Sequence, residues 1–288
     1  MLRRNIFVLG KGGVGKTTLS LLMALYFSSE YDIGLYSFDP AHNLFDLLES
    51  KSLNKNLYIE EVDFEKWKKK YLQQLRHSLK SSYSYLSAYN LLQYFDIFEQ
   101  APDSDNLGMI LAYEHILTKN KHNFLIFDMP PTAVALEFFR TIRRNRRWIE
   151  VLSDLRQRIL NKKEVISVIK FGKKKIETDK VMARLKSMQK FYTTLEKAIE
   201  DSYFFIIRNP DNLSHKEGDR IKSALENLDI NKITFIDNKI ETSVSERVLR
   251  KFDEKTNIVR SFDKILTKNK RLFIELEEIL ELKFTDKQ

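Results

Sequence analysis

The residues that follow the first apolar run of the chain have the types and spacing of a phosphate-binding loop. From Gly10 to Thr18 they read GKGGVGKTT and match the pattern G-x-x-x-x-G-K-[ST] in full. Glycines let backbone N–H groups converge on an anion, and the following helix adds the positive end of its dipole. Lys16 would reach the β- and γ-phosphates of ATP, and the Thr17 hydroxyl would ligate Mg²⁺. The alternative is a glycine-rich turn that binds nothing. The expected nucleotide ligands are Gly10, Gly12, Gly13, Gly15, Lys16, Thr17 and Thr18.

Two aspartates stand where apolar runs end, and both are candidates for the same site. Asp39 follows the run 33–38, and Asp128 closes the run FLIFD at 124–128. Ligands of open α/β sheets bind at the carboxyl ends of the strands. A carboxylate at Asp39 could orient the attacking water, and one at Asp128 could hold Mg²⁺ directly or through water. The structural alternatives are a turn-forming Asp-Pro at Asp39 and a strand-end cap at Asp128.

The string DPAHNL from Asp39 to Leu44 resembles the first switch of the arsenical pump-driving ATPases and of their eukaryotic relatives that target tail-anchored membrane proteins. The resemblance implies ATP hydrolysis, with Asp39 activating the water. The segment from Phe127 to Thr132 resembles the family's second switch, D-T-A-P-T-G-H-T, only in part. Asp128, Pro131 and Thr132 match, whereas Ala133 and Val134 replace its Gly-His, which indicates a divergent branch.

Lys11 is a second lysine in the phosphate loop, and one bound triphosphate does not need two. Its position resembles the signature lysine of the deviant Walker A group, which reaches the nucleotide of the partner subunit. The resemblance implies a homodimer in which Lys11 completes the partner's site. A positive charge supplied in trans would act as an arginine finger does. The alternative is a solvated side chain.

Asn238 lies in the segment FIDNK at 235–239, which resembles the family's strand ending in V-N-[KQ]. In the family this asparagine reads the adenine edge. An amide can pair with the donor and acceptor of that edge, so the role is chemically sound. The alternative is a turn asparagine.

The elements that must position these residues follow an alternating order. Apolar runs separated by helical stretches predict an α/β fold with a doubly wound, mostly parallel sheet of seven or eight strands, as in P-loop NTPases. Two long helical elaborations are expected at about 64–120 and 136–202, the second with a break at 171–173. We interpret 1–288 as one domain. The expected strands lie at 5–9, 33–38, 57–62, 124–128, 203–208, 233–237 and 257–259.

Composition restricts the chemistry. The 288 residues include no cysteine, which excludes thiolate zinc sites, disulfides and an arsenite-thiolate site. The net charge is +9, and residues 140–190 hold 17 Lys and Arg against 5 Asp and Glu. The first apolar run is too short for a signal peptide, and no run approaches the length of a membrane span. We therefore expect a cytoplasmic protein, with peripheral association with the membrane left open.

The partner is left open between several classes. The family resemblance implies a membrane protein as client, for which 64–98 could supply an apolar groove, although a Trp/Tyr/Leu stripe at helical spacing is typical of ordinary core. The basic segment 140–190 is compatible with a solvated face, an anionic membrane surface or, less favoured, nucleic acid. The alternative function is that of a partition- or septum-site-type ATPase switch that binds DNA or membrane through this segment.

Overall fold

The fold is built on a parallel sheet of six strands in the order β3-β2-β4-β1-β5-β6. The computed structural model describes residues 4–39, 44, 55–82, 104–171, 179–239 and 269–282. Every strand pair within these residues is parallel, as expected of alternating strands and helices. The strands are β1 (Arg4–Gly10), β2 (Ile33–Ser37), β3 (Leu57–Glu61), β4 (Phe124–Asp128), β5 (Tyr203–Arg208) and β6 (Ile233–Asp237).

Six of the predicted strands are therefore confirmed. The central strands β1, β2 and β4 are buried almost throughout, because a parallel sheet is covered by helices on both faces. The seventh predicted strand, at 257–259, lies outside the described residues. The α/β class and the parallel arrangement are as the sequence predicted.

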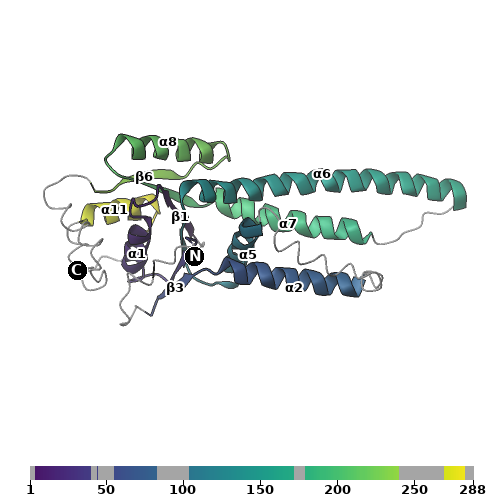
Figure 1. The fold of residues 1–288 in the computed structure, drawn as a ribbon, viewed down its shortest axis with the longest axis horizontal. Coiled ribbons are helices and arrows are strands. Elements are labelled where there is room, and N and C mark those ends of the chain that lie inside the picture. The colour runs from purple at the N-terminus through teal and green to yellow at the C-terminus, as the bar shows by residue number, and fades with distance from the viewer. Residues whose placement is uncertain are drawn as a thin grey trace.

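Helices cover the two faces of the sheet unequally (Figure 1). Ile6 and Val8 of β1 belong to a core shared with α1 and α11, whereas Phe7 and Leu9 face the core shared with α5, α6, α7 and α8. The alternation follows from the two-residue period of a strand. The helices are α1 (Lys16–Phe27), α2 (Phe64–Ser82), α5 (Ser104–Lys119), α6 (Thr132–Phe171), α7 (Lys180–Glu200), α8 (Asn212–Glu226) and α11 (Lys270–Ile279).

Phe7 is the centre of the larger core. Its ring stacks on Phe127 of β4 at 4.9 Å and on Phe204 of β5 at 5.0 Å. Phe139 of α6 meets it edge-on at 5.2 Å, so the first turns of α6 are held against the sheet. Aromatic pairs of this kind add about 1 kcal/mol each beyond the area they bury. The strand that leads into the phosphate loop is thereby anchored in the larger core.

The predicted helical elaborations form two projecting layers. In the first, α2 packs on α5, and residues 83–103 between them lie outside the described residues. The ring of Trp67 in α2 lies against that of His115 in α5, with 4.4 Å between the ring centroids, and packs against the larger core, so this member of the predicted stripe has the core role.

In the second projecting layer, α6 and α7 run side by side away from the sheet (Figure 1). The 40 residues of α6 make it about 60 Å long. It ends at Phe171, inside the predicted break, and residues 172–178 are not described. Asp179 caps the start of α7, because its carboxylate accepts from the Met182 amide at 2.7 Å, and it also pairs with Arg156 of α6. None of the described helices combines the length and the apolar composition needed to span a bilayer.

Candidate active site

The loop between β1 and α1 lies at the carboxyl edge of the sheet and depends on its glycines. Gly10 has φ +147°, and a Cβ there would lie 2.6 Å from the carbonyl oxygen of Ile207 on β5. Gly15 is in the left-handed region at φ +98° and is the N-cap of α1 without a side-chain cap. The amides of the first turn of α1 therefore face the loop, as the sequence pattern predicts for a phosphate site.

Lys16 is the first residue of α1, and its side chain is only 6% exposed. Its ammonium lies 3.5 Å from the carbonyl oxygen of Lys11, a long hydrogen bond for a buried cation. Burial lowers the pKa of Lys16, and the nearby carboxylates of Asp128 and Asp39 act in the opposite sense. The three side chains that the sequence placed in one site thus act on one another electrostatically.

Asp128 is the last residue of β4 and is fully buried. Ser20 Oγ lies 3.5 Å from its Oδ1, whereas Oδ2 has no hydrogen-bond partner within the described part of the chain. Burial raises the pKa of Asp128 to about 6, against the opposing effects of the Thr17 hydroxyl and the Lys16 ammonium. A carboxylate oxygen left unpaired beside a threonine hydroxyl is a donor set that Mg²⁺ accepts.

Asp39 follows β2 on the same edge. The Phe38 amide donates to the carbonyl oxygen of Asp128 at 2.8 Å, which ties the end of β2 to the end of β4. Asp39 raises the pKa of both Lys16 and Asp128, and its side chain is half-buried. Residues 40–43 of the switch-like string lie outside the described residues.

Asn238 approaches the phosphate loop from the far side of β5. Its backbone amide donates to the Arg208 carbonyl oxygen at 2.7 Å, and its Nδ2 donates to the carbonyl oxygen of Val14 at 2.7 Å. A Cβ on Gly15 would lie 2.6 Å from this Nδ2. The residue that the sequence singled out for adenine is thus hydrogen-bonded to the loop that would hold the phosphates.

Lys239 completes this contact and was assigned no role from the sequence. It has φ +57°, and its ammonium donates to the Gly13 carbonyl oxygen at 3.2 Å. Its backbone amide donates to Asn238 Oδ1 at 2.9 Å. We call Asn238 and Lys239 the loop clamp. The only signal for Lys239 in the sequence is its place in the N-[KQ] pair.

The remaining predicted residues lie around this centre. Lys11 has an exposed side chain, and only its carbonyl oxygen contacts Lys16. Thr18 is half-buried on α1, and Gly12 is exposed. Thr132, from the partial second switch, begins α6, and its buried hydroxyl has no hydrogen-bond partner in the part of the chain that the structure describes. Ser20 also escaped sequence reasoning, although it follows Thr17 by one helical turn and so faces the same carboxylate.

In this fold the first strand of a parallel sheet leads through a glycine loop into a helix. A buried lysine and the carboxylates at the ends of the neighbouring strands complete the site. This combination defines a P-loop ATPase. The family of Anion-transporting ATPases matches residues 3–266. The chain belongs to this ATPase family.

Individual relatives agree with the family match. The "Putative arsenical pump-driving ATPase 2" of Aquifex aeolicus is 25% identical over 245 residues, which cover 82% of this chain and 80% of the relative. An "ATPase ASNA1 homolog" of Cryptosporidium parvum is 27% identical over 76% of this chain and 60% of the relative. One of Plasmodium vivax is 23% identical over 93% and 74%. Neither the family match nor these relatives support the alternative of a partition- or septum-site-type switch.

Proposed function

We propose that this ATPase hydrolyses ATP at the loop 10–18 with Mg²⁺ and works as a nucleotide-switched homodimer. The observation that carries the proposal is the buried Lys16 ammonium, which lies at a helix N-terminus and acts on the carboxylates of Asp39 and Asp128. A buried cation is unfavourable unless it is paired, and a bound triphosphate would supply several charged acceptors.

Thr17 and Asp128 would hold the metal ion, directly or through water. The unpaired Oδ2 of Asp128 supports this assignment, because metal coordination would compensate the buried charge. Bound Mg²⁺ would neutralise charge on the phosphate oxygens during transfer. Ser20 would keep the carboxylate oriented through its hydrogen bond.

Asp39 would accept a hydrogen bond from the attacking water and align it with the γ-phosphate. Its place two residues beyond β2, within the electrostatic reach of Lys16, supports this role. The experiment is Asp39→Asn, measured by ATP binding and by phosphate release. We expect retained binding and a loss of turnover of about 100-fold or more.

The matched control for that experiment is Asp32→Asn. Asp32 precedes β2 at the opposite edge of the sheet, and its carboxylate pairs with His122 at 2.9 Å. Asp39 has no part in hydrolysis if Asp39→Asn turns over ATP at the rate of Asp32→Asn.

The loop clamp would join base recognition to phosphate binding. Asn238 uses one amide hydrogen for Val14 and one carbonyl lone pair for the Lys239 amide. An amide side chain has two donor hydrogens and two acceptor lone pairs, so one of each is left for the adenine edge. The same side chain could then contact the base and hold the loop that grips the phosphates.

Lys11 would complete the site of the partner subunit. Its exposed side chain at the rim of the loop supports a role outside its own pocket. Without cysteine, the dimer would be held through nucleotide and side-chain contacts. The resemblance to tail-anchor targeting ATPases supports a membrane protein as client, and nucleotide-dependent capture of a transmembrane peptide by the purified protein tests this.

A further inference from the structure

The projecting part of α6 carries an apolar stripe that faces outward. Trp148 is 62% exposed and Ile169 78%, and the members between them are also exposed. At 3.6 residues per turn they fall within about 80° of one another around the helix. The α6 stripe consists of Trp148, Val151, Leu155, Ile159, Ile166 and Ile169.

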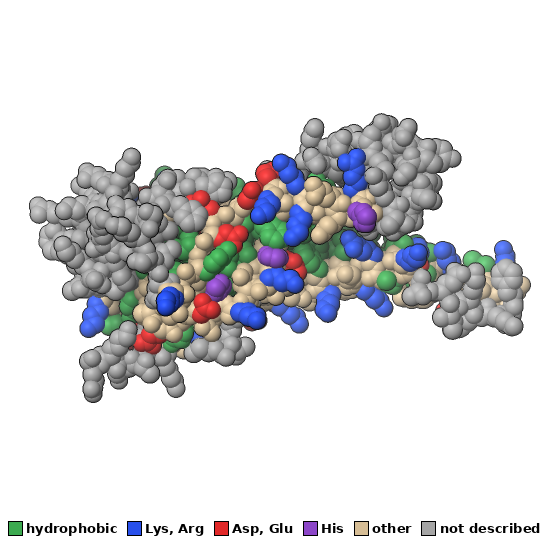
Figure 2. Space-filling model, turned by 90° about the horizontal axis from the view of Figure 1, so that it is seen from below, with side chains coloured by type: hydrophobic (Ala, Val, Ile, Leu, Met, Phe, Trp, Pro, Cys, Tyr) green, Lys and Arg blue, Asp and Glu red, His purple; other side chains and the backbone are tan. Residues whose placement is uncertain are grey.

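Cations flank this stripe, and the acids of residues 148–169, the part of α6 that carries it, are turned away from it. On the same wheel, the exposed Arg140, Arg147, Arg158 and Lys162 lie within about 80° of the middle of the stripe. Glu150, Asp154 and Glu164 lie about 100–180° from it. Figure 2, seen from the side on which α2 and α7 lie, shows basic and hydrophobic side chains mixed on the projecting end of the molecule.

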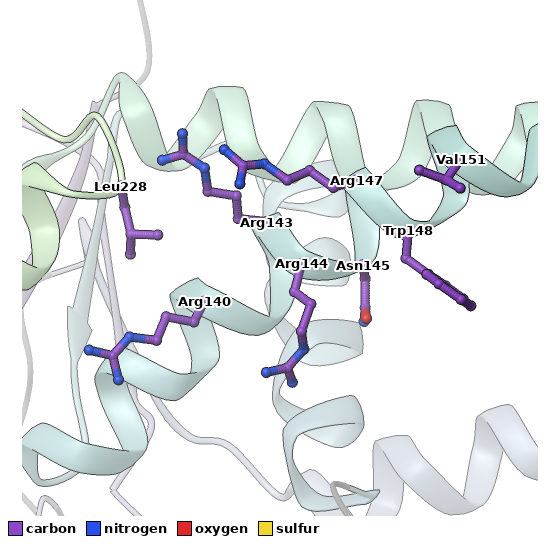
Figure 3. Close-up of a pocket in the computed structure, with 8 residues that line it drawn as sticks. All are labelled: Arg140, Arg143, Arg144, Asn145, Arg147, Trp148, Val151 and Leu228. Atoms are coloured by element: carbon purple, nitrogen blue, oxygen red, sulfur yellow. The ribbon is translucent and has the colours of Figure 1, made fainter. Parts of the chain in front are cut away.

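The arginines at the start of α6 have two different roles: some hold the helix through ion pairs, and the others remain exposed. Arg143 pairs with Asp229, and Arg146 pairs with Glu150 and with Glu196 of α7, so these two hold the helix in place. Figure 3 shows the Trp148 ring extending away from the guanidinium groups of Arg143 and Arg147, at a shallow cavity of about 570 Å³. The side chains that remain exposed on this face are cationic or apolar.

We propose that the α6 stripe docks on an anionic lipid bilayer, with the apolar side chains in the interface and the cations on lipid phosphates. A face with Trp, Ile and Leu at its centre and Arg and Lys beside it has the chemistry of an interfacial helix. A second copy of the chain would bring like charges together. An uncharged transmembrane helix would leave the cations without partners, and nucleic acid would leave the aliphatic stripe in water.

The first test is flotation of the full-length protein with vesicles of phosphatidylcholine alone and of equal parts phosphatidylcholine and phosphatidylglycerol. We expect binding only to the anionic vesicles, a blue shift of the tryptophan emission on binding, and loss of that shift in Trp148→Phe. Raising the salt from about 0.05 M to about 0.5 M should weaken the binding. Equal binding to both vesicles, or none to either, overturns the proposal.

The second test uses a pair of neighbouring substitutions. Ile166 (51% exposed) belongs to the stripe, whereas Val168 (44% exposed) lies about 140° from the middle of the stripe on the same turns. Ile166→Asp should lower the vesicle partition coefficient at least about tenfold, and Val168→Asp should leave it unchanged. Lys162→Ala should lower it about fivefold. None of the three changes touches the active site, so all three variants should hydrolyse ATP as wild type does.

Other occupants of the stripe give different outcomes of the same measurements. A blue shift that grows with protein concentration in the absence of lipid would assign the stripe to a second copy. A shift with a transmembrane peptide but not with vesicles would assign it to a client, and binding to duplex DNA that Ile166→Asp leaves intact would assign the cations to nucleic acid. Each of these results contradicts docking on lipid, and none of them bears on ATP hydrolysis.

Discussion

The charge on Asp128 should destabilise the protein when neither metal nor nucleotide is present. Burial raises the pKa of Asp128 from 3.8 to about 6. At about 1.4 kcal/mol per pKa unit, the ionised carboxylate is about 3 kcal/mol less favourable in the folded than in the unfolded chain. Because the pKa of Asp128 is higher in the folded than in the unfolded chain, the protonated carboxyl group contributes its full stabilisation below about pH 4. This contribution is lost as the pH rises through about 6.

Replacing the carboxylate by an amide should therefore stabilise the protein at neutral pH. In Asp128→Asn the amide keeps the oxygen that Ser20 contacts but places an unpaired donor at Oδ2, at a cost of about 1 kcal/mol. The net gain is about 2 kcal/mol, or about 3 °C in Tm for a chain of 288 residues. Mg²⁺-dependent hydrolysis should be lost in the same variant, because the ligand is neutral.

The assay is thermal and urea unfolding of both proteins at pH 4, 5, 6 and 7.5 in the presence of chelator. The difference in free energy of unfolding between the wild type and Asp128→Asn should increase from pH 4 to pH 7.5, and ATP with Mg²⁺ should stabilise the wild type more than Asp128→Asn. Asp39→Asn is the control from the same site, with a half-buried carboxylate in place of a fully buried one. A variant less stable than wild type at pH 7.5, or a difference independent of pH, would refute the reasoning.

Three further predictions concern the loop and its partners. Gly15→Ala should lower the free energy of unfolding by about 1–3 kcal/mol, since its Cβ would meet Asn238 at 2.6 Å and φ is +98°, whereas Gly12→Ala, with nothing within 4 Å, should leave it unchanged. Asn238→Ala should weaken ATP binding about 10- to 100-fold and abolish the preference for ATP over a purine triphosphate that lacks the 6-amino group. Lys239→Ala should weaken the binding of both triphosphates equally. Lys11→Ala should abolish ATP turnover. In a dimer of one variant and one wild-type subunit, hydrolysis should be lost at the nucleotide of the wild-type subunit. A protein that light scattering shows to be a monomer and that is fully active would exclude this role in trans.

Much of the sheet could be predicted because its information is local. Each of β1, β2 and β4 is a short apolar run bounded by a turn or a glycine, and the helices between them require parallel crossovers. The phosphate loop carries its own geometry, since the backbone at Gly10 and Gly15 excludes other residues. Asp39 and Asp128 then meet because adjacent parallel strands end at one edge.

The contacts that sequence reasoning did not predict are those that depend on tertiary packing. Asn238 and Val14 are 224 residues apart, and their hydrogen bond exists only because the loop after β6 passes over β5. No local pattern specifies that distance. The arginines near residue 145 form one cluster in the sequence, but packing against α7 and the end of α8 assigns Arg143 and Arg146 to ion pairs. Charge counts along a chain cannot separate such structural cations from surface ones.

The same helix joins the catalytic edge to the outward-facing stripe. Asp128 ends β4, and Thr132 begins α6 four residues later. Because α6 continues unbroken for about 60 Å, a tilt of about 5° at Thr132 would move its far end by about 5 Å. Packing against α7 restrains the middle of the helix but leaves the stripe on the opposite surface exposed. Vesicle binding compared with ADP, with ATP and without nucleotide therefore measures how far the state of the site is transmitted along α6. A nucleotide-independent partition coefficient would mean that the site and the stripe act separately.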